Sequence, residues 1–368
     1  MIGFGQNVNI PDTNFKAYLV GNIAINTNGD AEIQVSEAIV FNGTIDCSNL
    51  NISDLTGIEE FTDLDVLRCA NNQLTSIDIS NNTALNLFQC QNNDLTSLDV
   101  SNNTALTIMY CSGNPLTNLD VTNNIALILL QCNGNDLTSL DVSTNTALTT
   151  LYCQDNQLTS LDVSNNTAVI NLYCGWNLLT SLDVNTNTAL NTLHCHYNQL
   201  TSLDVSANIA LTTLHCYLNQ LTILDISNDT ALTELSCYFN QITSLDVSNN
   251  TVLNTLYCSN NNLATLDVRN GNNTNFSVIN PSFNAKNNPN LYCIDVDNVA
   301  WSTANWIYID SWTSFDTNCS ATSVQEHTTN KELLKVTDLL GRETKGKKNR
   351  PFFYIYEEGT VEKTITIE

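Results

Sequence analysis

Apolar and polar residues follow each other along most of this chain in a pattern that repeats every 21 residues. The clearest copy spans residues 148–168 and reads LTTLYCQDNQLTSLDVSNNTA. Within it, Leu151 and Cys153 alternate with polar neighbours, which is typical of a short strand with one buried side. The segment after Asn156 is too short for an α-helix, so we expect turns there, with a second short strand at LDV. A fixed period of this length predicts a solenoid, in which each turn buries the apolar side of its neighbours.

Three residue types are constant in ten successive repeats: a cysteine, an asparagine three residues later and an aspartate nine residues later. We expect the asparagine amides to bond the backbone of their own turn and of the next turn. The cysteines fit a row of small buried residues, with a soft-metal or redox site as the alternative. The aspartates fit turns in which the carboxylate accepts from following N–H groups, and a line of Ca²⁺ ions is the alternative. The cysteines are Cys69, Cys90, Cys111, Cys132, Cys153, Cys174, Cys195, Cys216, Cys237 and Cys258.

The spacing L-x-x-L-x-C-x-x-N-x-L, from Leu148 to Leu158, resembles the leucine-rich repeat, with cysteine where that family has an apolar residue. The resemblance implies a leucine-rich-repeat solenoid that is mostly β, with parallel strands on its inner face and turns or short strands outside. We predict this solenoid over residues 46–269. An N-terminal helical cap is expected over residues 6–45, with Asp12 as a helix N-cap, and a C-terminal cap over residues 270–320.

Charge excludes one class of partner, and hydropathy excludes a transmembrane segment in this sequence. The chain has 37 acidic and 12 basic residues and a formal net charge of −25. Nucleic acid is therefore excluded as a partner, because binding phosphates needs a basic surface. No apolar run reaches the length of a transmembrane segment. Residues 1–5 fit the end of a signal peptide, which is an expectation about processing.

Residues 26–37, NTNGDAEIQVSE, resemble the twelve-residue calcium loop of EF-hand proteins. Two positions depart from that family, since Asn replaces the first Asp and Ala31 stands where the sharp turn usually has Gly. The alternative is a polar turn that leads into the first strand. The Ca²⁺ ligands implied by the resemblance are Asn26, Asn28, Asp30, Glu32 through its carbonyl, and Glu37.

The predicted C-terminal cap contains two cysteines outside the repeat, Cys293 and Cys319, which bracket several tryptophans. We expect a Cys293–Cys319 disulfide, which would close the cap and imply an oxidising compartment. Two buried thiols in an intracellular protein are the alternative.

The end of the chain has a different composition. Residues 321–330 are polar and are expected to form a linker, and eight of the 12 Lys and Arg residues follow it. KVTDLLGRE, FFYIY and GTVEK within residues 331–368 resemble the C-terminal sorting domain of the type IX secretion system. The resemblance implies that the type IX secretion machinery reads this tail. The protein would then be secreted, or held on the outer cell surface of a Gram-negative bacterium.

Variable positions flank each cysteine and are expected to line the inner face in columns. Aromatic and histidine side chains concentrate there in the second half of the repeats. Exposed aromatic rings with polar tips fit a surface that binds a protein or a glycan, and the alternative is a β-rich surface with no ligand. The candidate ligand-binding residues are Tyr152, Tyr173, Trp176, His194, His196, Tyr197, His215, Tyr217, Tyr238, Phe239 and Tyr257.

Three histidines in these columns suggest a metal site as a further hypothesis. His194 and His196 fall on the same side of one predicted strand, and His215 is expected beside His194 on the next. Three imidazoles so placed could hold Zn²⁺ with an open position. No carboxylate accompanies them in these columns as a general base or supporting ligand.

The sequence shows no nucleophile triad, phosphate loop or pair of carboxylates in a predicted cleft, so we do not expect an enzyme. The interpretation is a secreted or cell-surface binding or adhesion protein that recognises a protein or glycan through its inner face. A structural surface-layer or matrix protein stabilised by calcium is the first alternative. A zinc-dependent hydrolase at the histidines is the second.

Overall fold

The computed structural model describes residues 5–277, 282–319, 333–337, 351–356 and 361–365. It divides into two compact units, Met1–Thr317 and Asn318–Glu368. Residues 1–4 of the predicted signal-peptide end, and the whole predicted linker 321–330, lie outside the described residues.

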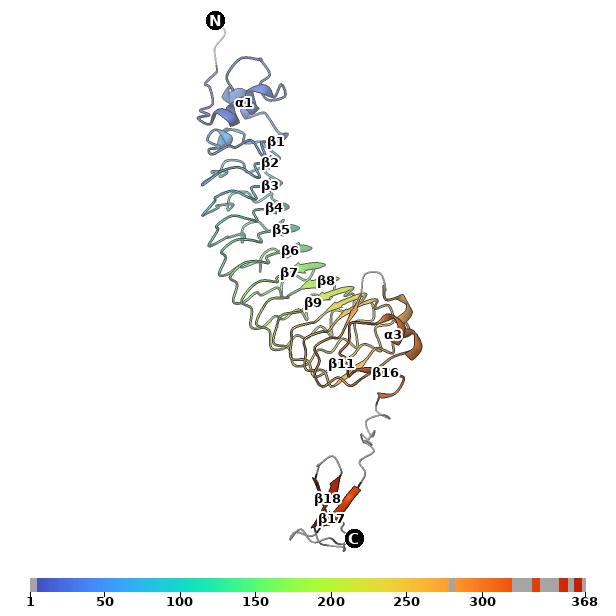
Figure 1. The fold of residues 1–368 in the computed structure, drawn as a ribbon. Helices are drawn as coiled ribbons and strands as arrows, with labels where there is room; N and C mark the ends of the chain where they lie inside the picture. Colours follow the sequence, from blue (N-terminus) through green and yellow to red (C-terminus); the bar gives the residue numbers. More distant parts are fainter. Residues whose placement is uncertain (1–4, 278–281, 320–332, 338–350, 357–360, 366–368) are drawn as a thin grey trace. The chain divides into compact units, whose positions relative to one another are not determined.

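The first unit is a parallel β-solenoid whose turns stack one on the next, as Figure 1 shows. Each short strand has a buried middle residue, and equivalent positions of neighbouring turns lie side by side, as in Leu151 beside Leu172. This confirms the predicted parallel strands. Within the described residues the main sheet has 12 strands. They are β1 (Thr44–Asp46), β2 (Val66–Arg68), β3 (Leu87–Gln89), β4 (Ile108–Tyr110), β5 (Leu129–Gln131), β6 (Thr150–Tyr152), β7 (Asn171–Tyr173), β8 (Thr192–His194), β9 (Thr213–His215), β10 (Glu234–Ser236), β12 (Thr255–Tyr257) and β14 (Phe283–Asn284).

The cysteine ladder runs through the core of this solenoid. Every cysteine from Cys47 to Cys258 is a buried free thiol. Burial raises the pKa of the Cys132 thiol to about 12, because an ionised thiolate would be poorly solvated there. The ladder therefore consists of protonated thiols that pack as small apolar groups.

The asparagine ladder satisfies backbone groups at the bend after each strand. The Nδ2 group of Asn156 donates to the carbonyl oxygens of Cys153 and Cys132, both at 3.1 Å. Its Oδ1 atom accepts from the Leu137 N–H at 3.0 Å. Each amide thus joins its own turn to the preceding turn, whereas the sequence analysis expected the following one.

A second asparagine ladder, which the sequence analysis did not single out, lies in the turn after LDV. The Nδ2 group of Asn166 donates to the carbonyl oxygens of Val142 and Asn145, both at 2.9 Å. At one turn this position holds Asp229. Its side chain is fully buried, and neither carboxylate oxygen has a hydrogen-bond partner.

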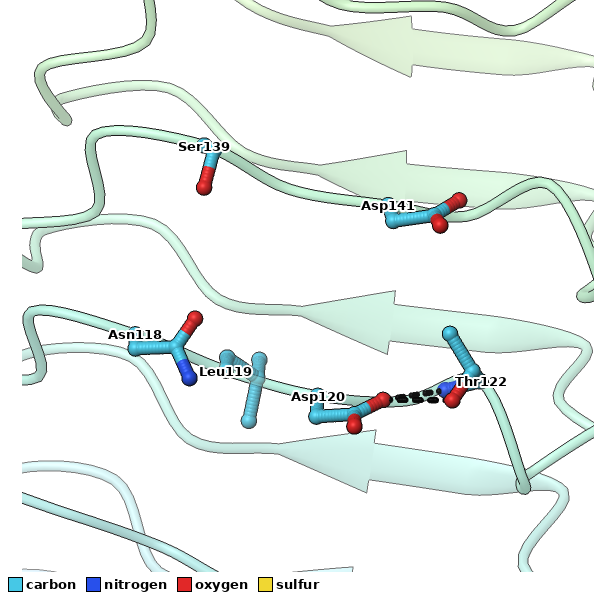
Figure 2. Close-up of a pocket in the computed structure, with 6 residues that line it drawn as sticks. All are labelled: Asn118, Leu119, Asp120, Thr122, Ser139 and Asp141. Carbon is cyan, nitrogen blue, oxygen red and sulfur yellow. Dashed lines mark hydrogen bonds between the residues drawn. The ribbon is translucent and has the colours of Figure 1, made fainter.

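The aspartates within the LDV segments form ordinary turns on the outer side of the solenoid. Asp120 accepts hydrogen bonds from the Thr122 N–H at 2.9 Å and the Thr122 hydroxyl at 2.6 Å, as Figure 2 shows. Asp120 and Asp141 line one shallow pocket between successive turns. The LDV strand becomes regular near the end of the unit, where a second parallel sheet forms. It consists of β11 (Ser244–Asp246), β13 (Thr265–Asp267), β15 (Cys293–Asp295) and β16 (Ser314–Asp316).

The predicted N-terminal helix is present as α1 (Thr13–Gly21). The Asp12 side chain caps it by accepting from the N–H groups of Asn14 and Phe15. Phe15 and Leu19 are completely buried in the core that continues into the first turns. The short helices α2 (Val35–Ala38) and η1 (Ile58–Glu60) follow.

The EF-hand-like loop at residues 26–37 is bonded to itself, so the predicted calcium site is not supported. Oε1 of Glu37 accepts from the Thr27 N–H and hydroxyl, both at 2.8 Å, and its Oε2 accepts from the Gln34 N–H. Nδ2 of Asn26 donates to the Asp30 carbonyl oxygen at 2.7 Å. The Asn28 amide also donates to the Asp30 carboxylate. The Glu32 side chain pairs with Lys16, whereas the predicted ligand at this position was the Glu32 carbonyl.

The segment after the repeats contains η2 (Asn273–Asn275) and α3 (Val299–Asn305). Trp306 is buried here and stacks on Phe283, with 4.0 Å between ring centroids. Cys293 and Cys319 are both disulfide-bonded, which supports the predicted bridge.

The second unit contains a three-stranded antiparallel sheet, β17 (Leu333–Thr337), β18 (Pro351–Tyr356) and β19 (Val361–Ile365). These strands contain FFYIY and parts of KVTDLLGRE and GTVEK. The rest of the sorting-domain motifs lies outside the described residues. Across the parts of the chain that the structure describes, no helix is long and apolar enough to cross a bilayer.

Candidate ligand-binding face

The strands of the main sheet place the predicted residues in columns. The third residue of each strand points away from the core, so Tyr152, Tyr173, His194 and His215 lie side by side on β6 to β9. The ring of Tyr152 stacks on that of Tyr173 with 4.5 Å between centroids, and His194 stacks on His215 at 4.1 Å. The edge of His194 meets Tyr173 at 4.7 Å, which joins the two pairs.

A second column follows the cysteines. His196, Tyr217 and Tyr238 form one stack, with 4.4 Å and 4.3 Å between successive centroids. The His196 ring lies over Gly175, where a Cβ would come within 2.8 Å of it. Glycine at this turn therefore makes room for the imidazole.

A third column carries the most exposed rings. Trp176, Tyr197 and Phe239 are 49%, 37% and 48% exposed. Their φ angles are 53°, 52° and 52°, in the left-handed region that bulky residues rarely adopt. Several equivalent turns hold residues that tolerate this conformation, namely Asn71, Asn92, Gly113, Gly134 and Asn260.

Contacts between these columns join the rings into one continuous surface, called here the aromatic face. Tyr197 touches both His196 and Tyr217 with its edge, and Phe239 touches Tyr238. Burial and neighbouring imidazoles lower the pKa values of His194 and His196 to about 4, so both are neutral at pH 7. The aromatic face consists of Tyr152, Tyr173, Trp176, His194, His196, Tyr197, His215, Tyr217, Tyr238 and Phe239.

A carboxylate that the sequence analysis missed lies at the edge of this face. Nε2 of His215 is 2.8 Å from Oε1 of Glu234. Glu234 occupies the first position of β10, two residues before Ser236, which continues the column of His194 and His215. Tyr257 is the remaining predicted residue. Burial first, and the nearby Glu234 carboxylate second, raise the pKa of its phenol.

The geometry does not support the predicted zinc site. His194 and His215 present stacked ring faces to each other, whereas ligands to one ion would direct ring nitrogens at a common point. His215 is instead bonded to Glu234. Among the described residues, no group of three or more His, Cys, Asp or Glu side chains is arranged to hold a metal ion.

The first half of the inner face has a different chemistry, which the sequence analysis also missed. The first strand position holds Val66, Leu87, Ile108 and Leu129, aligned side by side on β2 to β5. All four are partly exposed. From β6 onward this position is polar, so the aliphatic column ends where the aromatic face begins.

Comparison with known proteins identifies the family. The chain is 37% identical to the functional domain of InlJ from Listeria monocytogenes, whose structure includes a cysteine ladder. The match covers 80% of this chain and 68% of that structure, with a TM-score of 0.70. The chain belongs to the InlJ family of leucine-rich-repeat proteins. The shared cysteine ladder is the feature that separates its repeats from the usual leucine-rich pattern.

Other matches show the fold alone. A leucine-rich-repeat protein of Leptospira interrogans is 23% identical, with 67% of this chain and 66% of that structure covered and a TM-score of 0.59. The plant peptide hormone receptor RGFR1, solved in complex with RGF2, is 16% identical, with 77% and 52% covered and a TM-score of 0.60. A family model for the LVIVD repeat matches residues 69–90, 88–111 and 217–240. No curated protein matches the chain.

Proposed function

We propose that this protein is a binding protein that recognises a partner through the aromatic face. The observation that carries the proposal is the left-handed backbone of Trp176, Tyr197 and Phe239. Each such residue costs on the order of 1 kcal/mol, although its side chain remains 37–49% exposed. Strain kept at exposed aromatic residues is expected where the rings serve a ligand.

The exposed chemistry favours a protein over a glycan. Sugar rings stack on open aromatic faces, but Tyr217 has His196 on one face and Tyr238 on the other. Within these stacks the ring faces are therefore largely occupied by neighbouring rings. Rigid, amphipathic groups of this kind are enriched at the centres of protein interfaces.

The aliphatic column extends the proposed interface. Leu87, Ile108 and Leu129 continue the same sheet toward the N-terminus, so one partner could contact apolar side chains along several turns. The fold is one that also holds a peptide hormone in RGFR1, solved with RGF2. Binding without catalysis is proposed, since His194 and His196 are neutral and no group of the described residues is arranged to hold a metal ion.

A binding screen with a matched variant tests the proposal. Residues 6–320 would be screened against a panel of surface proteins and glycans beside the triple variant Trp176→Asn, Tyr197→Asn, Phe239→Asn. Asparagine already occupies this column at Asn92 and Asn260, so the variant should fold. We expect a protein hit that the variant loses. A hit that the variant binds equally well would show that the aromatic face is not the site.

The C-terminal tail is proposed to act as the sorting signal for type IX secretion, with the mature protein secreted or held on the cell surface. The basic composition after residue 330 and the sequence motifs support this, and the disulfide at Cys293 and Cys319 fits an oxidising compartment. Intact-mass analysis of protein exported by the native host should show a chain that ends near residues 320–330. Retention of Glu368 in the exported protein would contradict the proposal.

A further inference from the structure

The side of Trp176 that faces the N-terminus is open. Tyr197 covers one face of the indole, with centroids 3.6 Å apart and planes 13° apart. The other face therefore points to the preceding turn, where the same column holds Asp155. The two turns are bonded at this place, since the N–H of Asn156 donates to the Trp176 carbonyl oxygen at 3.1 Å.

Asp155 leaves much of that indole face uncovered. Equivalent positions on bonded turns lie about 4.8 Å apart, and a carboxylate reaches far less distance from the backbone than an indole does. The Asp155 carboxylate also extends toward Gly134, where its Oδ2 atom is 3.8 Å from the position of a Cβ. The next turn holds Gly113, so no side chain blocks approach from this direction.

An indole face beside a carboxylate is a favourable environment for a cation. A guanidinium or ammonium group is attracted to the face of Trp within about 6 Å, and a guanidinium can also pair with a carboxylate through its planar fork. The turns that form this part of the face supply no such group, because the sequence has no Lys or Arg from residue 69 to residue 268. The four basic residues of the first unit lie outside this range, at Lys16, Arg68, Arg269 and Lys286.

We propose that the Asp155–Trp176 pair binds an arginine side chain presented by a basic protein partner. The proposal rests on the proposed function and specifies the chemistry of the partner. The net charge of −25 would steer a basic protein toward the face and oppose acidic ones. Glu234, bonded to His215, adds a second negative group at the opposite side of the aromatic face.

A pair of short peptides tests the cation directly. The full chain would be titrated with acetyl-Gly-Arg-Gly-amide and with the same peptide carrying citrulline, which is nearly isosteric but uncharged. The readout is the indole N–H signal of Trp176 in a two-dimensional NMR spectrum, assigned with Trp176→Phe. We expect the arginine peptide to shift this signal at lower concentration. Equal shifts with both peptides, or no shift with arginine, would overturn the proposal.

Two charge variants separate a local site from the general field. Asp155→Asn should weaken arginine-peptide binding about two- to five-fold, the range of an exposed ion pair or cation–π contact. Asp136→Asn removes the same charge from the preceding turn, at an exposed residue outside this column, and should leave binding unchanged. Equal weakening in both variants would show that the effect comes from net charge alone, and it would contradict the proposed arginine site.

The same variants distinguish this proposal from the function on which it rests. Once the screen has given a protein partner, the triple aromatic variant and Asp155→Asn would be compared for binding it. Loss of binding in both supports the arginine site. Loss in the triple variant alone would leave the aromatic face as the interface and refute the arginine site, whereas retention in the triple variant would refute the proposed function itself.

Discussion

The indole of Trp176 lies flat on the phenol ring of Tyr197, on two turns whose backbones are both left-handed at these residues. Several other turns of this column hold residues that adopt this conformation easily, such as Asn92 and Gly113, while Leu218 shares the strained conformation. The solenoid therefore carries its bulkiest exposed side chains at the position least suited to them. This links the strained backbone to the surface where binding is proposed.

Relief of this strain should be measurable as stability. Phe239→Asn is expected to raise the free energy of unfolding by about 0.5–1 kcal/mol, because Asn tolerates the left-handed conformation and Phe239 is about half exposed. The reverse change, Asn260→Phe, should lower it by a similar amount or more, because it also removes the hydrogen bond that Asn287 donates to Asn260. Urea denaturation followed by circular dichroism measures both. A less stable Phe239→Asn variant would show that the contact with Tyr238 outweighs the strain.

Asp229 should make stability depend on pH in a way that a single substitution removes. Its burial without a partner raises the pKa of the carboxyl to about 7, against about 3.9 in the unfolded chain. Between these values the folded state keeps a proton that the unfolded state has lost. The contribution of this carboxyl to the free energy of unfolding is therefore fully present below pH 4 and is lost as the pH rises to about 7.

Asp229→Asn is expected to stabilise the protein increasingly across this range, reaching on the order of 4 kcal/mol at neutral pH from about 1.36 kcal/mol per pH unit. The asparagine would also donate to backbone oxygens, as Asn208 and Asn250 do. Denaturation from pH 4 to pH 8 measures the difference in the free energy of unfolding between variant and wild type. The other titrating groups contribute equally to both proteins and drop out of this difference. A difference that stays constant with pH would contradict the argument, and Asn208→Asp should create the same dependence in a neighbouring turn.

The imidazole of His194 should stay neutral near pH 7. Burial first, and the neighbouring His215 second, lower the pKa of His194 to about 4, so this imidazole stays neutral from about pH 5.5 to pH 8. An NMR titration of the His194 ring signals should show no protonation across this range and a change as the pH approaches 4. Protonation of His194 between pH 6 and pH 7 would contradict the argument.

The cysteine ladder should be chemically silent in the folded protein. Burial raises the pKa of Cys153 well above its ordinary value and that of Cys174 to about 12, and no ladder thiol is accessible to solvent. We expect a thiol reagent at pH 8 to label none of these cysteines until the protein is unfolded, when all should react. Rapid labelling of a ladder cysteine in the native protein would indicate local opening of that turn.

The N-terminal loop shows where a resemblance in sequence did not extend to a metal site. The residues matched the calcium-loop spacing, but Glu37 accepts from the backbone of Thr27, Asn28 and Gln34. Those N–H groups satisfy the carboxylate in place of a cation. Spacing alone predicted which residues share the loop, while the direction of each polar group depended on how the loop folds against α2.

The sequence by itself determined the solenoid, because a 21-residue period leaves the parallel stack as the way to bury Leu151, Cys153 and their equivalents. It also predicted the columns of the inner face, since strand alternation fixes which residues point outward. Only the tertiary structure decided how those side chains meet. Stacking of His194 on His215, the Glu234 contact and the left-handed backbone at Trp176 depend on distances between turns. Such distances arise when successive turns pack, and one repeat does not contain them.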